Sequence, residues 1–190
     1  MKKILGLTVA VLLSIGMVGI GTWAYFSDVE TSTSNVLTAG TLDLKTNDVD
    51  GVSQTLLATN MGPGDTIGPE TIILKNAGSI VGSTLDLAFT YVESDASSNP
   101  LNKSADDTAA MVEVITLKYD SSSLLASVVD NNVNGYRDIQ DLKNTDLSGQ
   151  SGMSASASKE FEITIKARDS IDSDYQADGI TITMTFTLNQ

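Results

Sequence analysis

The sequence contains no cysteine and no histidine among its 190 residues. Without cysteine no disulfide can form, so stability must come from packing, from a bound metal ion or from polymerisation. Without histidine and cysteine, neither the H-E-x-x-H motif nor any common zinc ligand set can be built. The same absence excludes serine–histidine and cysteine–histidine nucleophile pairs. We therefore expect a structural or binding protein and no enzyme.

Basic residues are scarce: 11 lysines and arginines stand against 24 aspartates and glutamates, a formal net charge of −13. Phosphate contacts require lysine and arginine, so nucleic acid and anionic membranes are not expected partners. The acidic balance favours solubility and cation binding, and it suits a salty or calcium-rich exterior. Paired acidic residues occur, but on polar segments, which is typical of a solvated surface.

The longest apolar run lies at the N-terminus. Two lysines precede the apolar stretch from Ile4 to Ile20, and small residues stand at Thr22 and Ala24. This order is typical of an export signal that is cleaved near Ala24. Two other interpretations stay open. The run is about long enough for a membrane anchor, and a pilin-type cut near Gly6 would leave the apolar helix on the mature chain.

Cleavage at this point leaves about 166 residues, enough for one domain with its own core. The mature chain keeps nine basic and 24 acidic residues, a formal charge of −15. We divide the sequence into a signal peptide (1–24), a leader (25–36) and a domain (37–190) with an inserted excursion at about 94–152. We expect the mature protein outside the cell, with no membrane contact after cleavage.

Short strands separated by turn residues follow the signal. Segments in which apolar and polar residues alternate with period two predict half-buried strands. The expected strands are Leu37–Lys45, Gln54–Thr59, Thr71–Asn76, Thr84–Val92, Met111–Tyr119, Phe161–Lys166 and Ile180–Leu188. The low-complexity stretch Ser148–Ser158 is expected to be a linker, and no amphipathic helix of three or more turns is expected. This pattern predicts an all-β antiparallel sandwich.

The last predicted strand alternates most strictly. Its apolar face consists of Ile180, Ile182, Met184, Phe186 and Leu188. That face must pack against a second sheet, so the threonines between these residues form the outer face.

One polar loop has the spacing of a calcium-binding loop. In a twelve-residue calcium loop, oxygen ligands stand at positions 1, 3, 5, 7, 9 and 12, and a glycine at position 6 allows a sharp turn. Counted from Asp130, this glycine is Gly135. The ligand positions, with a backbone carbonyl at position 7, are Asp130, Asn132, Asn134, Tyr136, Asp138 and Asp141. We predict a structural Ca²⁺ site of modest affinity.

The loop departs from the calcium pattern in several ways. Position 12 is Asp141 rather than glutamate, so its bidentate reach is shorter, and position 8 is Arg137 rather than an aliphatic residue. Only three of the side-chain ligands are carboxylates. No second loop of this kind is present, so a paired EF-hand is not expected. The alternative is a surface turn rich in Asn and Asp that binds no metal.

Five motifs occur in order along the chain. They are G-T-W-A-Y-F-S-D at 21–28, T-A-G-T-L-D-L at 38–44, G-P-G-D at 62–65, L-K-N-A-G-S at 74–79 and D-G-I-T-I-T-M-T-F at 178–186. With these motifs the chain resembles the TasA/camelysin family of secreted biofilm-matrix proteins and their archaeal pilus-forming relatives. Residues at about 94–152 show no motif that aligns, and the resemblance does not supply the calcium loop.

The resemblance implies a jelly-roll fold and cleavage between Ala24 and Tyr25 by a dedicated signal peptidase. It also implies fibres assembled by donor-strand exchange, in which the freed N-terminus completes the sheet of the next subunit. The expected donor strand comprises Tyr25, Phe26, Ser27, Asp28, Val29, Glu30, Thr31, Ser32 and Thr33. This segment is rich in β-forming residues, and an extended segment can add to an open sheet edge. Such a head-to-tail contact propagates as a filament. An ordinary edge strand or leader within a monomer is the alternative.

Two classes of function remain. The first is a secreted subunit that polymerises with itself into extracellular fibres or pili, for biofilm matrix or cell–cell adhesion. The second is a monomeric calcium-binding surface adhesin or binding module that holds a ligand at its excursion. Asn102 begins an N-K-S glycosylation sequon, a triplet that is also common by chance.

Overall fold

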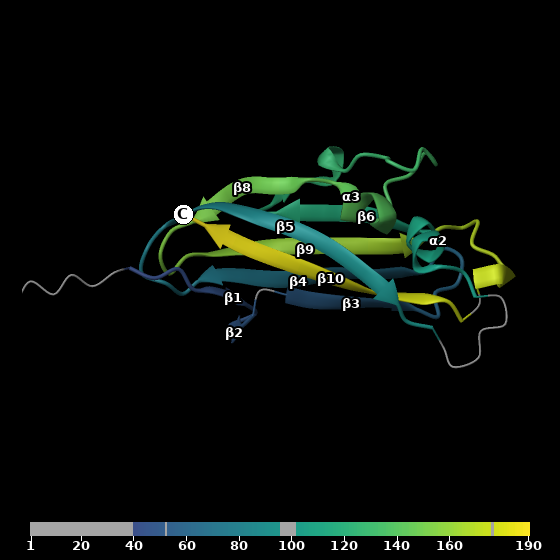
Figure 1. The fold of residues 1–190 in the computed structure, drawn as a ribbon, viewed down its shortest axis with the longest axis horizontal. Helices are drawn as coiled ribbons and strands as arrows, with labels where there is room; N and C mark the ends of the chain where they lie inside the picture. Colours follow the sequence, from purple (N-terminus) through teal and green to yellow (C-terminus); the bar gives the residue numbers. More distant parts are fainter. Residues whose placement is uncertain (1–39, 52, 96–101, 176) are drawn as a thin grey trace, which may run out of the picture. The chain divides into compact units, whose positions relative to one another are not determined.

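Strands make up most of the chain that the computed structural model describes, residues 40–51, 53–95, 102–175 and 177–190 (Figure 1). The expected signal peptide, the cleavage site at Ala24 and Tyr25, and the expected donor strand lie outside the described residues. The strands are β1 (Leu44–Thr46), β2 (Val49–Asp50), β3 (Ser53–Thr59), β4 (Thr66–Asn76), β5 (Gly82–Glu93), β6 (Val112–Tyr119), β7 (Ser122–Ser123), β8 (Leu147–Met153), β9 (Ser158–Ala167) and β10 (Gly179–Asn189). Short helices occupy the connections: α2 (Ala105–Ala110), η1 (Leu125–Ser127), α3 (Ile139–Asn144) and η2 (Ser173–Tyr175).

The strands form two antiparallel sheets. A six-stranded sheet has the order β2-β1-β4-β9-β6-β7, and a four-stranded sheet has the order β3-β10-β5-β8. From β3 onward the pairing is nested: β3 pairs with β10, β4 with β9, β5 with β8 and β6 with β7. A chain folded back on itself in this way, with successive pairs in alternate sheets, is a jelly roll. The β1–β2 hairpin extends the six-stranded sheet beyond β4.

Aromatic rings from both sheets meet in the core. The Phe161 ring of β9 lies 5.2 Å from the Phe186 ring of β10, edge to face, and 6.2 Å from the Phe89 ring of β5. Each phenylalanine alternates with less buried residues along its strand. Burial of a side chain of this size contributes about 1.5–3 kcal/mol, and an edge-to-face pair adds about 0.5–1.5 kcal/mol. These contacts therefore hold the two sheets together.

The predicted all-β antiparallel sandwich is confirmed, and its strand order is that of the jelly roll implied by the resemblance. Residues 94–152, set apart above as an excursion, contribute β6, β7 and β8 to the two sheets. No helix within the described segments is long and apolar enough to cross a membrane.

The linker expected at Ser148–Ser158 is wrong, because most of this stretch lies in strands. Strand β8 pairs with β5 at the edge of the four-stranded sheet, and its end residues Leu147 and Met153 are buried. Of the two glycines between them, Gly152 is required by close packing: a Cβ at Gly152 would lie 2.0 Å from the carbonyl oxygen of Gly82. The small residues that suggested a linker thus permit a close approach of two backbones.

Candidate functional site

The predicted calcium loop, Asp130–Asp141, lies in the connection between β7 and β8 and ends in α3. The Val114 N–H of β6 donates to the Arg137 carbonyl at 2.8 Å, which ties the loop to the six-stranded sheet. Close behind Arg137, Ile139 and Leu142 of α3 are fully buried in the core. The C-terminal end of the loop is therefore anchored to both the sheet and the core.

Two of the predicted ligands form the N-terminal cap of α3. The Asp141 N–H donates to Asp138 Oδ1 at 3.0 Å, and the Asp138 N–H donates to Asp141 Oδ2 at 3.3 Å, a reciprocal capping box. Both carboxylates are fully buried. This arrangement satisfies backbone donors that the first turn of a helix otherwise leaves without partners.

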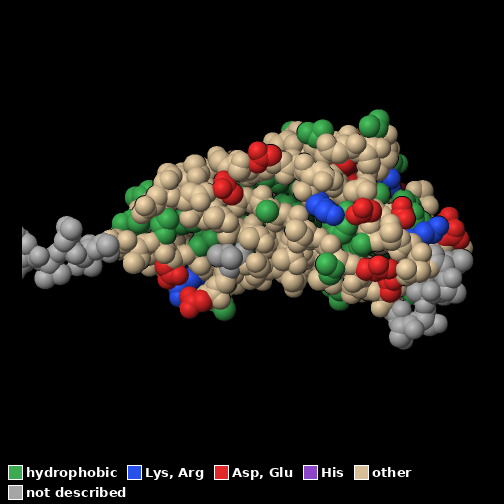
Figure 2. Space-filling model, in the orientation of Figure 1, with side chains coloured by type: hydrophobic (Ala, Val, Ile, Leu, Met, Phe, Trp, Pro, Cys, Tyr) green, Lys and Arg blue, Asp and Glu red, His purple; other side chains and the backbone are tan. Residues whose placement is uncertain are grey.

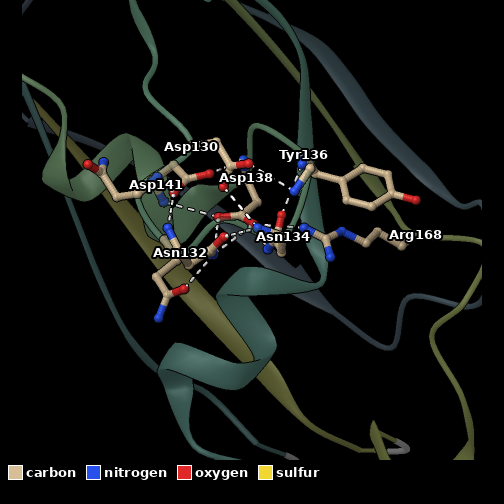
Figure 3. A network of polar contacts seen from close by, with 10 residues as sticks. Asp130, Asn132, Asn134, Tyr136, Asp138, Asp141 and Arg168 are labelled. Atoms are coloured by element: carbon tan, nitrogen blue, oxygen red, sulfur yellow. Dashed lines mark hydrogen bonds and ion pairs between the residues drawn. The ribbon is translucent and has the colours of Figure 1, made fainter.

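The remaining carboxylate oxygens hold the loop backbone (Figure 3). Asp141 Oδ1 accepts hydrogen bonds from the N–H groups of Asn131 at 2.7 Å and Asn132 at 3.3 Å. Asp130 accepts from the N–H groups of Asn134 at 3.1 Å and Gly135 at 2.8 Å. Gly135 has φ of +85°, a left-handed conformation that favours glycine. The sharp turn expected at this glycine is present.

The side-chain amides of Asn132 and Asn134 both donate to the Asp138 carboxylate, and Asn132 Nδ2 also donates to Gln140 Oε1 at 2.6 Å. Asn132 Nδ2 and Asn134 Nδ2 lie 3.2 Å and 2.8 Å from Asp138 Oδ2. Their oxygens point the other way: Asn132 Oδ1 accepts from the Asn134 N–H, and Asn134 Oδ1 accepts from the Tyr136 N–H. A cation beside Asp138 would require these amides to rotate so that their oxygens replace their nitrogens.

Arg168, which follows β9, supplies positive charge to this cluster and was missed in the sequence. Its Nη2 lies 2.7 Å from Asp138 Oδ2, and its guanidinium stacks 3.9 Å from the centroid of the Tyr136 ring (Figure 3). The other arginine of the chain, Arg137, donates from Nε to the Val128 carbonyl at 3.0 Å. Both arginines of the sequence thus make contacts in this loop. That the chain has only two arginines was the one feature of the sequence that could have pointed to Arg168.

Asp138 carries opposing influences on its ionisation. Burial raises the pKa of Asp138, while hydrogen bonds from Asn134, from the Asp141 backbone and from Asn132 act in the opposite direction. The neighbouring guanidinium favours the charged carboxylate. The cluster is therefore a buried ion pair surrounded by donors, which holds the loop in one conformation.

Within the described ranges, no three or more histidine, cysteine, aspartate or glutamate side chains are grouped as metal ligands. The calcium prediction also relies on amide and carbonyl oxygens, and it stays a prediction. A zinc peptidase site does not fit the residues present, because the sequence has no histidine and no cysteine.

Two of the recognised motifs meet where the described chain begins. The Ser79 and Ile80 N–H groups donate to the Thr41 carbonyl at 2.8 Å and 3.3 Å, which places the start of the domain on the β4–β5 turn. A Cβ at Gly78 would lie 2.1 Å from the Thr41 carbonyl, so only glycine permits this contact. The L-K-N-A-G-S and T-A-G-T-L-D-L motifs therefore encode one junction.

A buried asparagine completes this junction. Asn76 Nδ2 donates to the carbonyls of Ile80 at 2.8 Å and Met153 at 3.2 Å, and Asn76 Oδ1 accepts from the Gly78 N–H at 3.1 Å. Asn76 thereby links the turn to β8 of the other sheet.

The G-P-G-D motif closes a turn beside the end of β9. The Gly62 N–H donates to Asp65 Oδ2 at 2.7 Å, and the Ala167 N–H donates to the Asp65 carbonyl at 2.8 Å. This motif, too, has a structural role among the described residues.

The sequon at Asn102 precedes a helix. Asn102 is exposed, and Ser104, the third residue of the sequon, caps α2 by accepting from the Asp107 N–H at 3.2 Å. Glycosylation of Asn102 stays a prediction.

Comparison with known proteins identifies one family. The family model described as camelysin metallo-endopeptidase matches residues 1–190, the whole of the sequence. No curated protein matches the chain.

Proposed function

The chain belongs to the camelysin/TasA family over its whole length, and from this membership we propose that it is a secreted structural subunit that polymerises into extracellular fibres or pili. The full-length family match carries the proposal. Within the family TasA members are structural, and the described residues form a jelly roll with an anchored start of the domain rather than a reaction centre.

The proposed mechanism is donation of residues 25–33 to a sheet edge of the next copy. Two sheet edges are too short to pair with a strand of this length, because β2 and β7 have two residues each. The edges of the four-stranded sheet, β3 and β8, have seven residues each. A donor strand that adds to such an edge gains backbone hydrogen bonds along its length. Because donor and acceptor are different surfaces, the contact repeats head to tail.

Electron microscopy of the exported protein, together with N-terminal sequencing, tests this proposal. We expect filaments whose subunits begin at Tyr25. We expect deletion of residues 25–35 to abolish the filaments and to leave a folded monomer, as judged by an unchanged cooperative melting transition. Filaments of normal length from the deleted chain would rule out strand donation. Single particles of the intact chain would favour the monomeric calcium-binding adhesin instead.

We further propose that the chain has no peptidase activity, despite the enzymatic name of its family. Metallo-endopeptidases hold zinc with histidine and glutamate side chains, a set that this sequence cannot build because it has no histidine. Incubation of purified protein with casein and added zinc is expected to release no peptides. Zinc-dependent cleavage that persists after rigorous purification would overturn this part of the proposal.

A further inference from the structure

The four-stranded sheet exposes an outer face with almost no charge. Its outward residues alternate with the buried ones of β3, β5 and β10, and they align across the three strands in register. They are Ser53, Thr55, Leu57 and Thr59 of β3, Thr84, Asp86, Ala88, Thr90 and Val92 of β5, and Thr181, Thr183, Thr185 and Thr187 of β10. Figure 2 looks onto this side, and uncharged surface covers the middle of it.

Asp86 is the one charged side chain among these outward positions, and it is already engaged. Its carboxylate accepts hydrogen bonds from the Gly149 N–H at 2.8 Å and from Asn189 Nδ2 at 2.7 Å. The outer face of the six-stranded sheet is different, since it carries ion pairs such as Lys118 with Glu162 at 2.9 Å. The two faces of the sandwich are therefore electrostatically distinct.

We propose that the outer face of β3, β5 and β10, called here the threonine face, binds the same face of a second copy of this chain. Each chain carries a formal charge of −13, so two copies repel one another unless they meet through uncharged surface. A threonine hydroxyl both donates and accepts, so identical threonine arrays are self-complementary. A two-fold contact of one face with itself meets this requirement.

Apolar side chains at one end of the threonine face add to the attraction. Leu57 is 54% exposed and Val92 is 63% exposed, and both flank Thr181 in the paired register. In a two-fold contact this apolar end would be covered. Burial of apolar surface contributes about 25 cal/mol per Å².

The threonine face is small for a stable dimer. Three strands about 4.8 Å apart and roughly seven residues long cover a few hundred Å², less than the ~800 Å² per partner of a standard interface. A single contact is therefore weak, but contacts repeated along two filaments act together. The lateral pairing of filaments rests on the proposed function, whereas the pairing of single copies does not.

Lysine at the centre of the threonine face tests the proposal. Thr183 is half-buried and lies between Thr55 and Thr90 in the register. Its matched control is Thr164, which is also half-buried, faces outward in the middle of the six-stranded sheet and pairs with Thr116. We expect T183K filaments to remain single under electron microscopy, while parent and T164K filaments associate side by side. T183K filaments that bundle as the parent does would overturn the proposal.

Sedimentation velocity of the full chain separates this proposal from the filament proposal. If no filaments form, a reversible dimer of the parent and of T164K that is at least about tenfold weaker in T183K would support the threonine face alone. A parent chain that stays monomeric at all concentrations and never bundles would overturn it. Binding of the parent to a neutral insoluble polysaccharide, lost in T183K without self-association, would overturn it in favour of a glycan partner.

Discussion

At the scale of single residues, the ion pair between Arg168 and Asp138 decides how the Asp130–Asp141 loop is held. The Asp138 side chain is fully buried and that of Arg168 is 9% exposed, with Nη2 and Oδ2 2.7 Å apart. Both partners also make contacts within the loop, the carboxylate with amides and the guanidinium with the Tyr136 ring. Removal of one partner therefore leaves the other buried without its countercharge.

Arg168→Met is expected to lower the free energy of unfolding by about 3 kcal/mol, because it leaves the Asp138 carboxylate buried and unpaired. Urea denaturation measures this change. The control is Lys166→Met, which removes an exposed pair with Asp169 and is expected to cost under about 1 kcal/mol. The double variant with Asp138→Asn should recover part of the loss. Equal effects of the two single variants would argue against a buried ion pair.

The calcium prediction is tested by the melting temperature of the chain with and without calcium. Saturating calcium, at about 100 times its dissociation constant, would stabilise the folded state by about 2.7 kcal/mol. We expect calcium to raise the melting temperature of the parent but not that of Asp130→Ala, because position 1 of the loop would lack its ligand. Asp120→Ala, outside the loop, is the control. If the parent does not respond to calcium, the loop is no calcium site, and Arg168 supplies its countercharge.

Alkaline pH is expected to destabilise the chain through Tyr91. Burial, together with the hydrogen bond to Asp106 at 2.6 Å, raises the pKa of Tyr91 above its ordinary value of 10.0. The stabilisation of the folded state by protonated Tyr91 is therefore complete below about pH 10, and it is lost as the pH rises through the folded-state pKa of Tyr91.

The free energy of unfolding of the parent should fall as the pH rises above about 10, the ordinary pKa of tyrosine. Tyr91→Phe loses about 1 kcal/mol at neutral pH with its hydrogen bond, but it should fall less steeply. Parallel pH profiles of parent and variant would exclude this role of Tyr91.

At the scale of elements, the β4–β5 turn joins the start of the domain to both sheets through Asn76. Its side chain is fully buried and bonds to the turn and to Met153 at the end of β8. Two carbonyls and one N–H depend on this one amide for their hydrogen bonds. Buried backbone groups that lose their partners are costly.

Asn76→Ala is expected to lower the free energy of unfolding by about 2–3 kcal/mol, because it leaves these backbone groups unsatisfied. Hydrogen exchange should show faster exchange of the Gly78 amide and earlier opening of the turn. Asn144→Ala, which removes an exposed hydrogen bond to the Gln140 carbonyl, should change stability by about 0.5 kcal/mol or less. A loss at Asn76 no larger than at Asn144 would contradict this role.

At the scale of the whole molecule, net charge opposes every contact between copies. Each chain carries −13 or, after the expected cleavage, −15, so assembly must overcome mutual repulsion. Salt shortens the range of this repulsion from about 30 Å at 0.01 M to about 8 Å at 0.15 M.

Light scattering at increasing salt is therefore expected to show more assembly, both head to tail and side by side. For T183K, added salt should lengthen the filaments but should not increase their bundling, because its threonine face carries an added charge. Assembly that weakens as salt rises would indicate contacts held by opposite charges and would contradict both proposed interfaces.

The most strictly alternating strands followed from the sequence because alternation is a local property, whereas the strand expected at Leu37–Lys45 is, among the described residues, only the short β1 at Leu44–Thr46. The segments Thr84–Val92 and Ile180–Leu188 lie within β5 and β10, whose faces are set by a period of two whatever the partner strand. The sharp turn at Gly135 was also predictable, since it depends on one residue and its neighbours. The motifs of the family were visible for the same reason.

Only the tertiary structure decided which distant segments meet. Strand β8 looked like a linker because its small residues make sense only beside the backbone of β5, more than 50 residues earlier in the chain. Arg168 could not be assigned to Asp138, because 30 residues and the whole of β8 and β9 separate them. Likewise, the net charge of the sequence does not show where the charges lie. Only the structure shows that the outer face of the six-stranded sheet is charged, whereas the threonine face carries almost no charge. Local patterns specify elements, whereas pairing, countercharges and surfaces depend on how those elements are brought together.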